Sequence, residues 1–510
     1  MQAPPAQPSA SVAVIPAADP SIRAFWAFVL VHVAAWTIAP AIAQRSVPFD
    51  TVEMLYWGRA WQWGYYKHPP LPAWIAELCS AAFGSADWPL YLASQICVAA
   101  SFLAAWLLAR RMLAPWPALA TVMLLEACPF LNFTTPQWNN NGPTKPCWAF
   151  ATLFLFDALT RRDWRCWAGA GVALGFGMLA KYDAVLLIAA MLGFLVVHPA
   201  ARWAWRTPGP YLMLAVAAIL VAPHAAWLLA GDAPSIAYIR ARVPETRTLV
   251  DHVVNPLHFL LAQVGAVAGV PLLCASVYGW SARIAPLEAG RRFQRDFLIA
   301  MVLGPPALAL SASLLTGMRM VAVWGSPMWT FFGLLLWMLF QPSGTNAVLW
   351  RLMRRSLAWG TVMLVAFTVA KALHGELAGR VTRVQVPGRE LAADIGRHWT
   401  AVTDEPLHIV GGDWWLAGIV AFYHPQRPQV FPDLRAEWAP WTSDAELRRT
   451  GGVVVWPGTG PMPEEWRRRF PRVIDEVTIS LPVRGWFRDL RSQCRMAIVP
   501  PSSNDEPMPR

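Results

Sequence analysis

The stretch Ala24–Ala43, AFWAFVLVHVAAWTIAPAIA, contains no charged residue. An α-helix rises about 1.5 Å per residue, so about 20 apolar residues span the hydrocarbon core of a bilayer. Similar apolar blocks recur along the chain, and hydrophobic residues make up 56% of it against 14% charged residues. A water-soluble surface cannot cover so much apolar material. The sequence therefore predicts an α-helical polytopic membrane protein.

The apolar blocks predict about eleven transmembrane helices, of which the fifth and sixth are short. The blocks are Ala24–Ala43, Trp88–Leu108, Pro117–Phe133, Lys145–Leu159, Trp167–Ala180, Ala184–Val197, Tyr211–Ala230, Pro256–Tyr278, Phe297–Leu315, Val321–Phe340 and Leu357–Leu373.

Clusters of arginine occur in every second connection between these blocks. Cytoplasmic loops of membrane proteins carry such an excess of basic residues, so the amino terminus is expected inside and the carboxyl terminus outside. The same clusters account for most of the net charge of +11, so a nucleic-acid partner is not needed to explain it. They are Arg110–Arg111, Arg161–Arg162 with Arg165, Arg202 with Arg206, Arg283 with Arg291, Arg292 and Arg295, and Arg351 with Arg354 and Arg355.

The amino-terminal residues 1–20 are rich in Ala, Pro and Ser and are predicted to form a disordered cytoplasmic tail. Ala41-Ile42-Ala43 resembles a signal-peptidase site after an apolar run. We expect the first span to stay uncleaved, because the polar loop that follows needs an anchor. The cysteines show no C-x-x-C spacing, which argues against a cysteine metal site.

Near Gly379 the composition changes to mixed charged and apolar residues with frequent Pro and Gly. This predicts three parts: the tail 1–20, a transmembrane domain 21–378 with a long outer loop 44–87, and a periplasmic α/β domain 379–510. Strands are expected at 407–410, 452–456 and 494–499. Helices are expected at 414–423, 443–449 and 464–470. Gly411-Gly412 lacks the spacing of a dinucleotide-binding loop and predicts a tight turn.

The first outer loop holds two carboxylates, Asp50 and Glu53, three residues apart. This spacing places both on one face if the segment is helical. A carboxylate in a partly dry cleft at the membrane boundary is more basic than usual and can deprotonate a hydroxyl. The alternative is that Asp50 only caps a helix that starts at Thr51.

The same loop continues through Lys67-His68-Pro69-Pro70. The two prolines fix the backbone and can start a new helix, which holds Lys67 and His68 at a defined angle. An ammonium group can neutralise a phosphate and an imidazole can donate a hydrogen bond to it. The alternative for Lys67 is that it extends to lipid headgroups, and this alternative is stronger for Arg240, Arg242 and Arg319.

Five segments together resemble the polyprenyl-phosphate-sugar-dependent glycosyltransferases of the GT-C class. More narrowly, they resemble the bacterial family 39 enzymes, which are relatives of protein O-mannosyltransferases and of the lipid A aminoarabinose transferase. The segments are Asp50-x-x-Glu53, Gly64-Tyr65-Tyr66-Lys67-His68-Pro69-Pro70-Leu71-x-x-Trp74, Asn140-Asn141-Gly142-Pro143, Gly175-x-Gly177-x-Leu179-Ala180-Lys181-Tyr182 and Arg319–Trp329.

The resemblance implies an inverting transfer, in which Asp50 acts as base on the acceptor and the sugar leaves a polyprenyl monophosphate. Relatives have adjacent Asp and Glu, whereas Thr51 and Val52 separate the acids here. The role of Glu53 therefore stays open: it shares catalysis, binds a divalent metal, binds the acceptor or does none of these, and His68 is a further candidate metal ligand. The implied phosphate-binding residues are Lys67, His68, Lys181 and Arg319, and the implied substrate-binding residues are Tyr66, Asn140, Asn141, Tyr182, Arg240 and Arg242.

The expected partners are a polyprenyl-phosphate sugar, the lipid bilayer and an envelope acceptor. Lipid A or lipopolysaccharide (LPS) is favoured, followed by protein hydroxyls and then another envelope glycan. The expected location is the bacterial inner membrane. A transporter or flippase is the competing class. Such proteins tend to show inverted repeats and ionisable residues near the bilayer midplane. This sequence shows no evident repeat, and the ionisable residues inside its apolar blocks lie mostly near the ends of the blocks. A membrane-anchored binding protein would leave the first outer loop unexplained.

Overall fold

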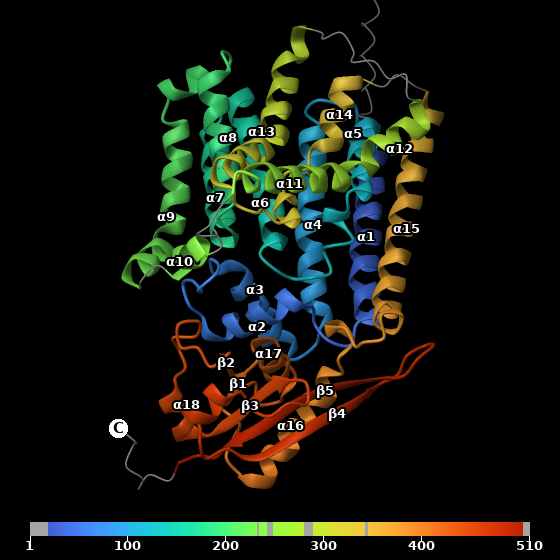
Figure 1. Ribbon diagram of the computed structural model, residues 1–510. Coiled ribbons are helices and arrows are strands. Elements are labelled where there is room, and N and C mark those ends of the chain that lie inside the picture. Colours follow the sequence, from blue (N-terminus) through green and yellow to red (C-terminus); the bar gives the residue numbers. More distant parts are fainter. Residues whose placement is uncertain (1–18, 232–233, 242–247, 280–288, 342–344, 503–510) are drawn as a thin grey trace, which may run out of the picture.

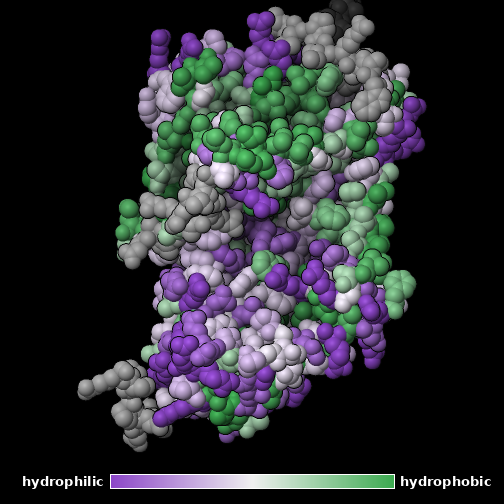
Figure 2. Space-filling view, in the orientation of Figure 1, coloured by the Kyte–Doolittle hydropathy of each residue, from purple (hydrophilic) through white to green (hydrophobic). Residues whose placement is uncertain are grey.

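The computed structural model describes residues 19–231, 234–241, 248–279, 289–341 and 345–502. A bundle of helices forms one part, and a five-stranded sheet with its own helices forms the other (Figure 1). Short helices of the first outer loop lie between the two parts (Figure 1). Apolar residues dominate the visible face of the bundle and polar residues that of the sheet domain (Figure 2). Residues 1–18, which hold most of the predicted tail, lie outside the described residues.

Among the described residues, five helices are long and apolar enough to cross a membrane. They are α1 (Pro20–Ala43), α4 (Trp88–Ala109), α9 (Gly209–Ala230), α13 (Arg292–Thr316) and α15 (Asn346–Ala378). The pair α11 (Asp251–Val267) and α12 (Gly269–Tyr278), bent by 42° at the break, would be a sixth span. These helices confirm a multi-pass membrane protein, whereas the count of eleven spans stays a prediction.

The other predicted spans correspond to helices that do not meet this length and hydropathy criterion. They are α5 (Pro115–Met123), α6 (Asn141–Arg161), α7 (Trp164–Ala180), α8 (Ala184–Val197) and α14 (Phe332–Phe340). The predicted span 117–133 is α5 followed by two 3-10 helices, Leu124–Ala127 and Pro129–Leu131, and 321–340 is the 3-10 helix Ala322–Gly325 followed by α14. Pro129 and Pro327 lack the backbone N–H that a continuous helix requires, which explains these breaks.

All the predicted arginine clusters that the structure describes lie at the end of the bundle away from the sheet domain. The ends of α1 and α15 adjoin that domain, so Arg110 after α4 and Arg351 early in α15 lie at the opposite end. At that end Arg355 donates a hydrogen bond to the carbonyl of Ser276 in α12, and His198 after α8 lies 3.6 Å from Asp296 in α13. One end of the bundle is thus basic, as the loop pattern predicts.

The first outer loop forms α2 (Phe49–Ala60) and α3 (Leu71–Phe83), which pack against each other and against the sheet domain. A Cβ on Gly58 would lie 2.2 Å from the carbonyl oxygen of Ala73, so only glycine lets α2 approach α3 this closely. A Cβ on Gly418, in α17 (Trp414–Tyr423), would lie 2.2 Å from a methyl group of Val52 in α2. These two contacts fix α2 between α3 and the sheet domain.

The carboxyl-terminal part contains one sheet with strand order β2-β1-β3-β5-β4. The strands β1 (Ile409–Gly412), β2 (Gln429–Pro432) and β3 (Gly452–Pro457) are parallel, and β4 (Ile474–Val483) and β5 (Leu490–Val499) form an antiparallel hairpin. The predicted β1, β3, β5, α17, α18 (Asp444–Thr450) and α19 (Glu464–Arg469) are present. Three elements were not predicted: α16 (Gly388–Val402), the short β2 and the half-exposed edge strand β4. The apolar pattern of β4 is weak, whereas α16 has a clear amphipathic pattern, with Leu391, Ile395 and Trp399 buried on one face.

Candidate functional site

Asp50 lies in the first turn of α2, half-buried at the junction of the two parts. The helix begins at Phe49 after Pro48, and no side chain caps it, so the interpretation of Asp50 as a cap for a helix starting at Thr51 is wrong. The Asn139 side chain instead donates a hydrogen bond to Asp50 Oδ2 at 3.2 Å. Burial raises the pKa of Asp50, while Asn139 and the ammonium groups of two lysines oppose that rise. Asp50 is therefore a stronger base than an exposed aspartate.

Glu53 lies one turn further along the same face of α2 and is buried. It forms an ion pair with Lys67, and the Tyr66 hydroxyl donates to its Oε1 at 3.4 Å. Burial raises the pKa of Glu53, and Lys67 opposes this shift. The carboxylate thus holds Lys67 and Tyr66 beside Asp50.

Lys67 turns into the protein, not outward to the lipid headgroups. Its Nζ lies 5.0 Å from the ring centroid of Tyr66, 5.8 Å from that of Tyr238 and 5.6 Å from that of Trp414. Aromatic faces attract a cation, so three rings and one carboxylate fix the ammonium group. His68 is half-buried, with its ring 6.2 Å from that of Trp57.

A second lysine, Lys181, reaches the same region from the end of α7. Its Nζ donates to Asn141 Oδ1 at 2.9 Å and lies 2.7 Å from Asp183 Oδ2. The ring of Trp324, in the 3-10 helix before α14, lies 5.5 Å away. Lys181 is near enough to Asp50 to stabilise its charged form.

Asn140 and Asn141 begin α6, and their side chains contact the end of α7. Asn140 Nδ2 donates to the carbonyl of Ala180 at 3.1 Å, one residue before Lys181. Asn141 accepts from Lys181 and donates to Asn139 Oδ1 at 3.1 Å. The asparagines therefore connect Lys181 to the side chain that holds Asp50.

Some of the predicted site residues lie elsewhere or outside the described residues. Tyr182 forms a hydrogen bond with His224 Nε2 at 2.9 Å and turns toward α9, away from Asp50. Arg319 is exposed in the turn after α13. Arg240 belongs to α10 (Pro234–Ala241), but its side chain and all of Arg242 are not among the described parts. Of the predicted residues, those brought together are Asp50, Glu53, Tyr66, Lys67, Asn140, Asn141 and Lys181.

The sheet domain supplies site residues that the sequence analysis missed. Trp438 stacks on Tyr66, with ring centroids 4.8 Å apart and planes 4° from parallel. Trp414, at the start of α17, faces Lys67. Asp433 follows β2, accepts from the backbone N–H of Trp414 at 3.2 Å, and influences Lys67 electrostatically. Side chains at the carboxyl ends of parallel strands commonly form binding sites.

No three His, Cys, Asp or Glu side chains in the described ranges are grouped so that they could hold a metal ion. Glu53, one of the two predicted metal ligands, is paired with Lys67. A metal bound by Glu53 and His68 would have to displace this ion pair, and such a site stays a prediction.

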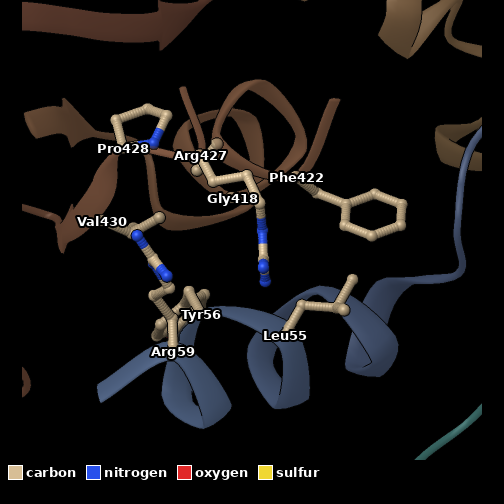
Figure 3. Close-up of a pocket in the computed structure, with 9 residues that line it drawn as sticks. Leu55, Tyr56, Arg59, Gly418, Phe422, Arg427, Pro428 and Val430 are labelled. Carbon is tan, nitrogen blue, oxygen red and sulfur yellow. The ribbon is translucent and has the colours of Figure 1, made fainter. Parts of the chain in front are cut away.

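A small cavity of about 20 Å³ lies between α2 and the sheet domain (Figure 3). Leu55, Tyr56 and Arg59 line it from α2, opposite Phe422 and Arg427 (Figure 3). Arg427 donates to Glu77 Oε2 in α3 at 2.6 Å. A cavity of this size holds about one water molecule, so it is part of a packed interface and not a substrate cavity.

The dolichyl-phosphate-mannose-protein mannosyltransferase family model matches residues 67–227. Lipopolysaccharide core galacturonosyltransferase RgtA of Rhizobium johnstonii is 25% identical over 430 residues, covering 82% of this chain and 83% of that protein. Undecaprenyl phosphate-alpha-4-amino-4-deoxy-L-arabinose arabinosyl transferase of Pseudomonas aeruginosa is 32% identical over 185 residues, 34% of this chain and 32% of that protein.

The crystal structure of ArnT from Cupriavidus metallidurans bound to undecaprenyl phosphate superimposes with a TM-score of 0.60 at 16% identity. The match covers 94% of this chain and 98% of ArnT. The apo structure of the same ArnT gives a TM-score of 0.61 at 14% identity. These superpositions show a shared fold, and they extend through the sheet domain. Together with the sequence relatives, they show that the chain is a glycosyltransferase of the GT-C class that resembles the aminoarabinose transferase.

Proposed function

We propose that the chain transfers a sugar from a polyprenyl-phosphate donor to lipid A or the LPS core. This proposal rests on one observation. The carboxylates of Asp50 and Glu53 lie together with the ammonium groups of Lys67 and Lys181 at the edge of the membrane bundle. A base and cations at this place suit a lipid-linked sugar phosphate whose tail stays in the bilayer. The name of RgtA, which matches most of the chain, supports the LPS core as acceptor.

The proposed reaction is a single displacement with inversion. Asp50 takes the proton of the acceptor hydroxyl while the hydroxyl oxygen forms a bond to the anomeric carbon of the sugar. The bond between that carbon and the phosphate oxygen breaks, and the phosphate leaves with its electron pair. Lys67 and Lys181 stabilise the negative charge that develops on the leaving phosphate. Trp438 and Tyr66 border the same region and would limit how a sugar can lie there.

Mass spectrometry of envelope lipids from a deletion strain tests the acceptor. Lipid A or LPS core is expected to lose the mass of one sugar residue, and plasmid-borne wild-type protein is expected to restore it. Plasmid-borne Asp50→Asn serves as the matched control and should not restore the mass. Unchanged lipid A and LPS, together with loss of sugar from envelope proteins, would favour a protein O-glycosyltransferase instead.

Transfer by purified protein in detergent distinguishes a transferase from a flippase. A flippase only moves its lipid across a bilayer, so it has no product to form in a micelle. A transferase is expected to convert donor and acceptor there into a glycosylated product. Absence of product in micelles, combined with donor movement across vesicles, would support the flippase.

We further propose that the protein lies in the bacterial inner membrane with its basic end in the cytoplasm. The location of the arginine clusters at the end opposite the sheet domain supports this orientation. Reporter fusions after Arg111, Arg206, Arg295 and Arg355 should report cytoplasm, and a fusion after Pro500 should report periplasm. A cytoplasmic signal at Pro500 would contradict the orientation.

The pH dependence of transfer is expected to reflect the raised pKa of Asp50. A base must be deprotonated, so kcat/KM should fall as the pH drops through this raised pKa. Asn139 stabilises the charged carboxylate of Asp50 by a hydrogen bond, so Asn139→Ala should raise the pKa of Asp50 further. The acid limb of the pH profile, where kcat/KM falls at low pH, should then move to higher pH. Tyr182→Phe is the matched control, because Tyr182 bonds to His224 and turns away from Asp50, so this change should leave the limb in place. Coinciding acid limbs in wild type and Asn139→Ala would contradict Asp50 as the titrating base.

A further inference from the structure

The tip of the β4–β5 hairpin, residues 484–489, exposes two large aromatic side chains. Trp486 is 84% exposed and Phe487 is 79% exposed. Gly485 allows the tight turn, because a Cβ there would lie 2.2 Å from the carbonyl oxygen of Arg488. The other large aromatic residues of this domain are buried or half-buried, so such an exposed pair is unusual and is unfavourable in water.

The tip is attached to the ends of two membrane helices. Glu376, near the end of α15, accepts hydrogen bonds from the backbone N–H groups of Trp486 and Phe487, both at 2.8 Å. Arg45, just after α1, donates to the carbonyl of Arg484 at 3.3 Å. The tip is therefore held at the boundary of the membrane bundle, although it belongs to the sheet domain (Figure 1).

The depth of the tip follows from the geometry of α15. Val362, Val365 and Val369 of this helix are about half exposed, as expected for side chains that face lipid. Glu376 lies seven residues beyond Val369, which is about 10 Å along the helix axis. A position about 10 Å beyond side chains that face lipid is expected near the headgroups, and Leu377, 80% exposed, continues the apolar stripe toward the tip.

The charged residues of the tip also suit contact with a lipid surface. Arg484 and Arg488 flank the two aromatic residues and are exposed. Tryptophan is enriched where a protein meets the interface between lipid and water, and arginine binds the phosphates of lipid headgroups. We propose that Trp486 and Phe487 insert into the outer headgroup layer of the phospholipid bilayer and anchor the sheet domain to the membrane.

This anchor has a consequence for the site. The sheet domain places Trp414 and Trp438 over Lys67 and Tyr66. An attachment through the hairpin limits rocking of the domain about the link between α15 and α16, so the two tryptophans keep their places. The anchor does not depend on which sugar or acceptor is used.

A spin label tests the proposal in the full-length protein reconstituted into nanodiscs of phosphatidylcholine and phosphatidylglycerol. One variant carries the label at Phe487→Cys, and a separate variant carries it at Trp486→Cys. Ala401→Cys is the matched control, because it is exposed near the end of α16 that points away from the junction (Figure 1). The unmutated chain, whose seven cysteines are buried or half-buried, measures background labelling.

Oxygen concentrates in the bilayer, whereas a water-soluble nickel chelate stays outside it. The ratio of oxygen to nickel accessibility is therefore expected to be several-fold higher at 487 and 486 than at 401. Equal ratios at all three positions would overturn the proposal. So would dipolar broadening at 487 that disappears on dilution with unlabelled protein, because it would place a second copy of the chain against the tip.

Discussion

Replacing Asp50 by Asn is expected to lower the rate of sugar transfer by about 10²–10⁴-fold, the usual contribution of a general base. The amide has nearly the same size and can still form a hydrogen bond with Asn139, but it cannot take a proton. Because Asp50 does not cap α2, the substitution should leave the helix intact. Initial rates with a purified donor and acceptor measure the effect, and melting temperature and donor binding should stay near the wild-type values.

Glu53→Gln is the matched comparison for Asp50→Asn, since both remove one carboxylate from the same face of α2. Glu53 is paired with Lys67, so its loss should act mainly on donor binding and stability. Near-normal turnover of Asp50→Asn with collapse of Glu53→Gln would move the base to Glu53. Near-normal turnover of both variants would contradict the proposed mechanism.

The Asp50 result also bears on the acceptor. A phosphate monoester has a second pKa of about 6 and is largely ionised at neutral pH, so it needs little help from a base. A hydroxyl group needs a base to become a good nucleophile. A large loss in Asp50→Asn would therefore favour a hydroxyl of lipid A or the LPS core over a phosphate of lipid A.

Replacing Lys67 by Met is expected to weaken use of the donor. Loss of a hydrogen bond to a charged group costs about 1.5–3 kcal/mol, and this corresponds to roughly a 10- to 150-fold fall in kcat/KM. Methionine keeps the length and the apolar stem among Tyr66, Tyr238 and Trp414 but removes the charge. Steady-state kinetics over a range of donor concentrations measure the change.

The same substitution leaves Glu53 buried without its partner. Breaking a buried ion pair from one side typically costs about 3–5 kcal/mol, although the raised pKa of Glu53 lets it take up a proton and reduces this cost. The melting temperature of Lys67→Met should therefore fall. The double variant Lys67→Met/Glu53→Gln removes both charges and should recover the melting temperature without recovering transfer.

Recovery of transfer in that double variant would show that Lys67 only neutralises Glu53 and does not hold the donor phosphate. His68→Ala provides a second comparison. Its ring is half-buried beside Trp57, so its removal is expected to have a smaller effect than removal of Lys67. Unchanged kinetics in both Lys67→Met and His68→Ala would rule out this loop as the phosphate site.

The sequence by itself determined the membrane class, the basic end of the bundle and the α/β character of residues after 379. These features depend on short-range quantities: the transfer free energy of each apolar block, the charge of each loop and the periodicity of each strand or helix. The α17 bounds, Trp414–Tyr423, agree with the predicted 414–423 because this run is apolar and flanked by polar residues. The acidic residues and the lysine of the first outer loop could also be identified from the sequence alone.

Only the tertiary structure decided which of these residues meet. It paired Lys67 with Glu53, placed Asn139 on Asp50, and turned Tyr182 toward His224. It also brought Trp438 onto Tyr66, although 371 residues separate them in the chain and no local pattern joins them. Such contacts depend on the packing of whole elements, for example the close approach of α17 to α2, and a local sequence pattern carries no information about that packing.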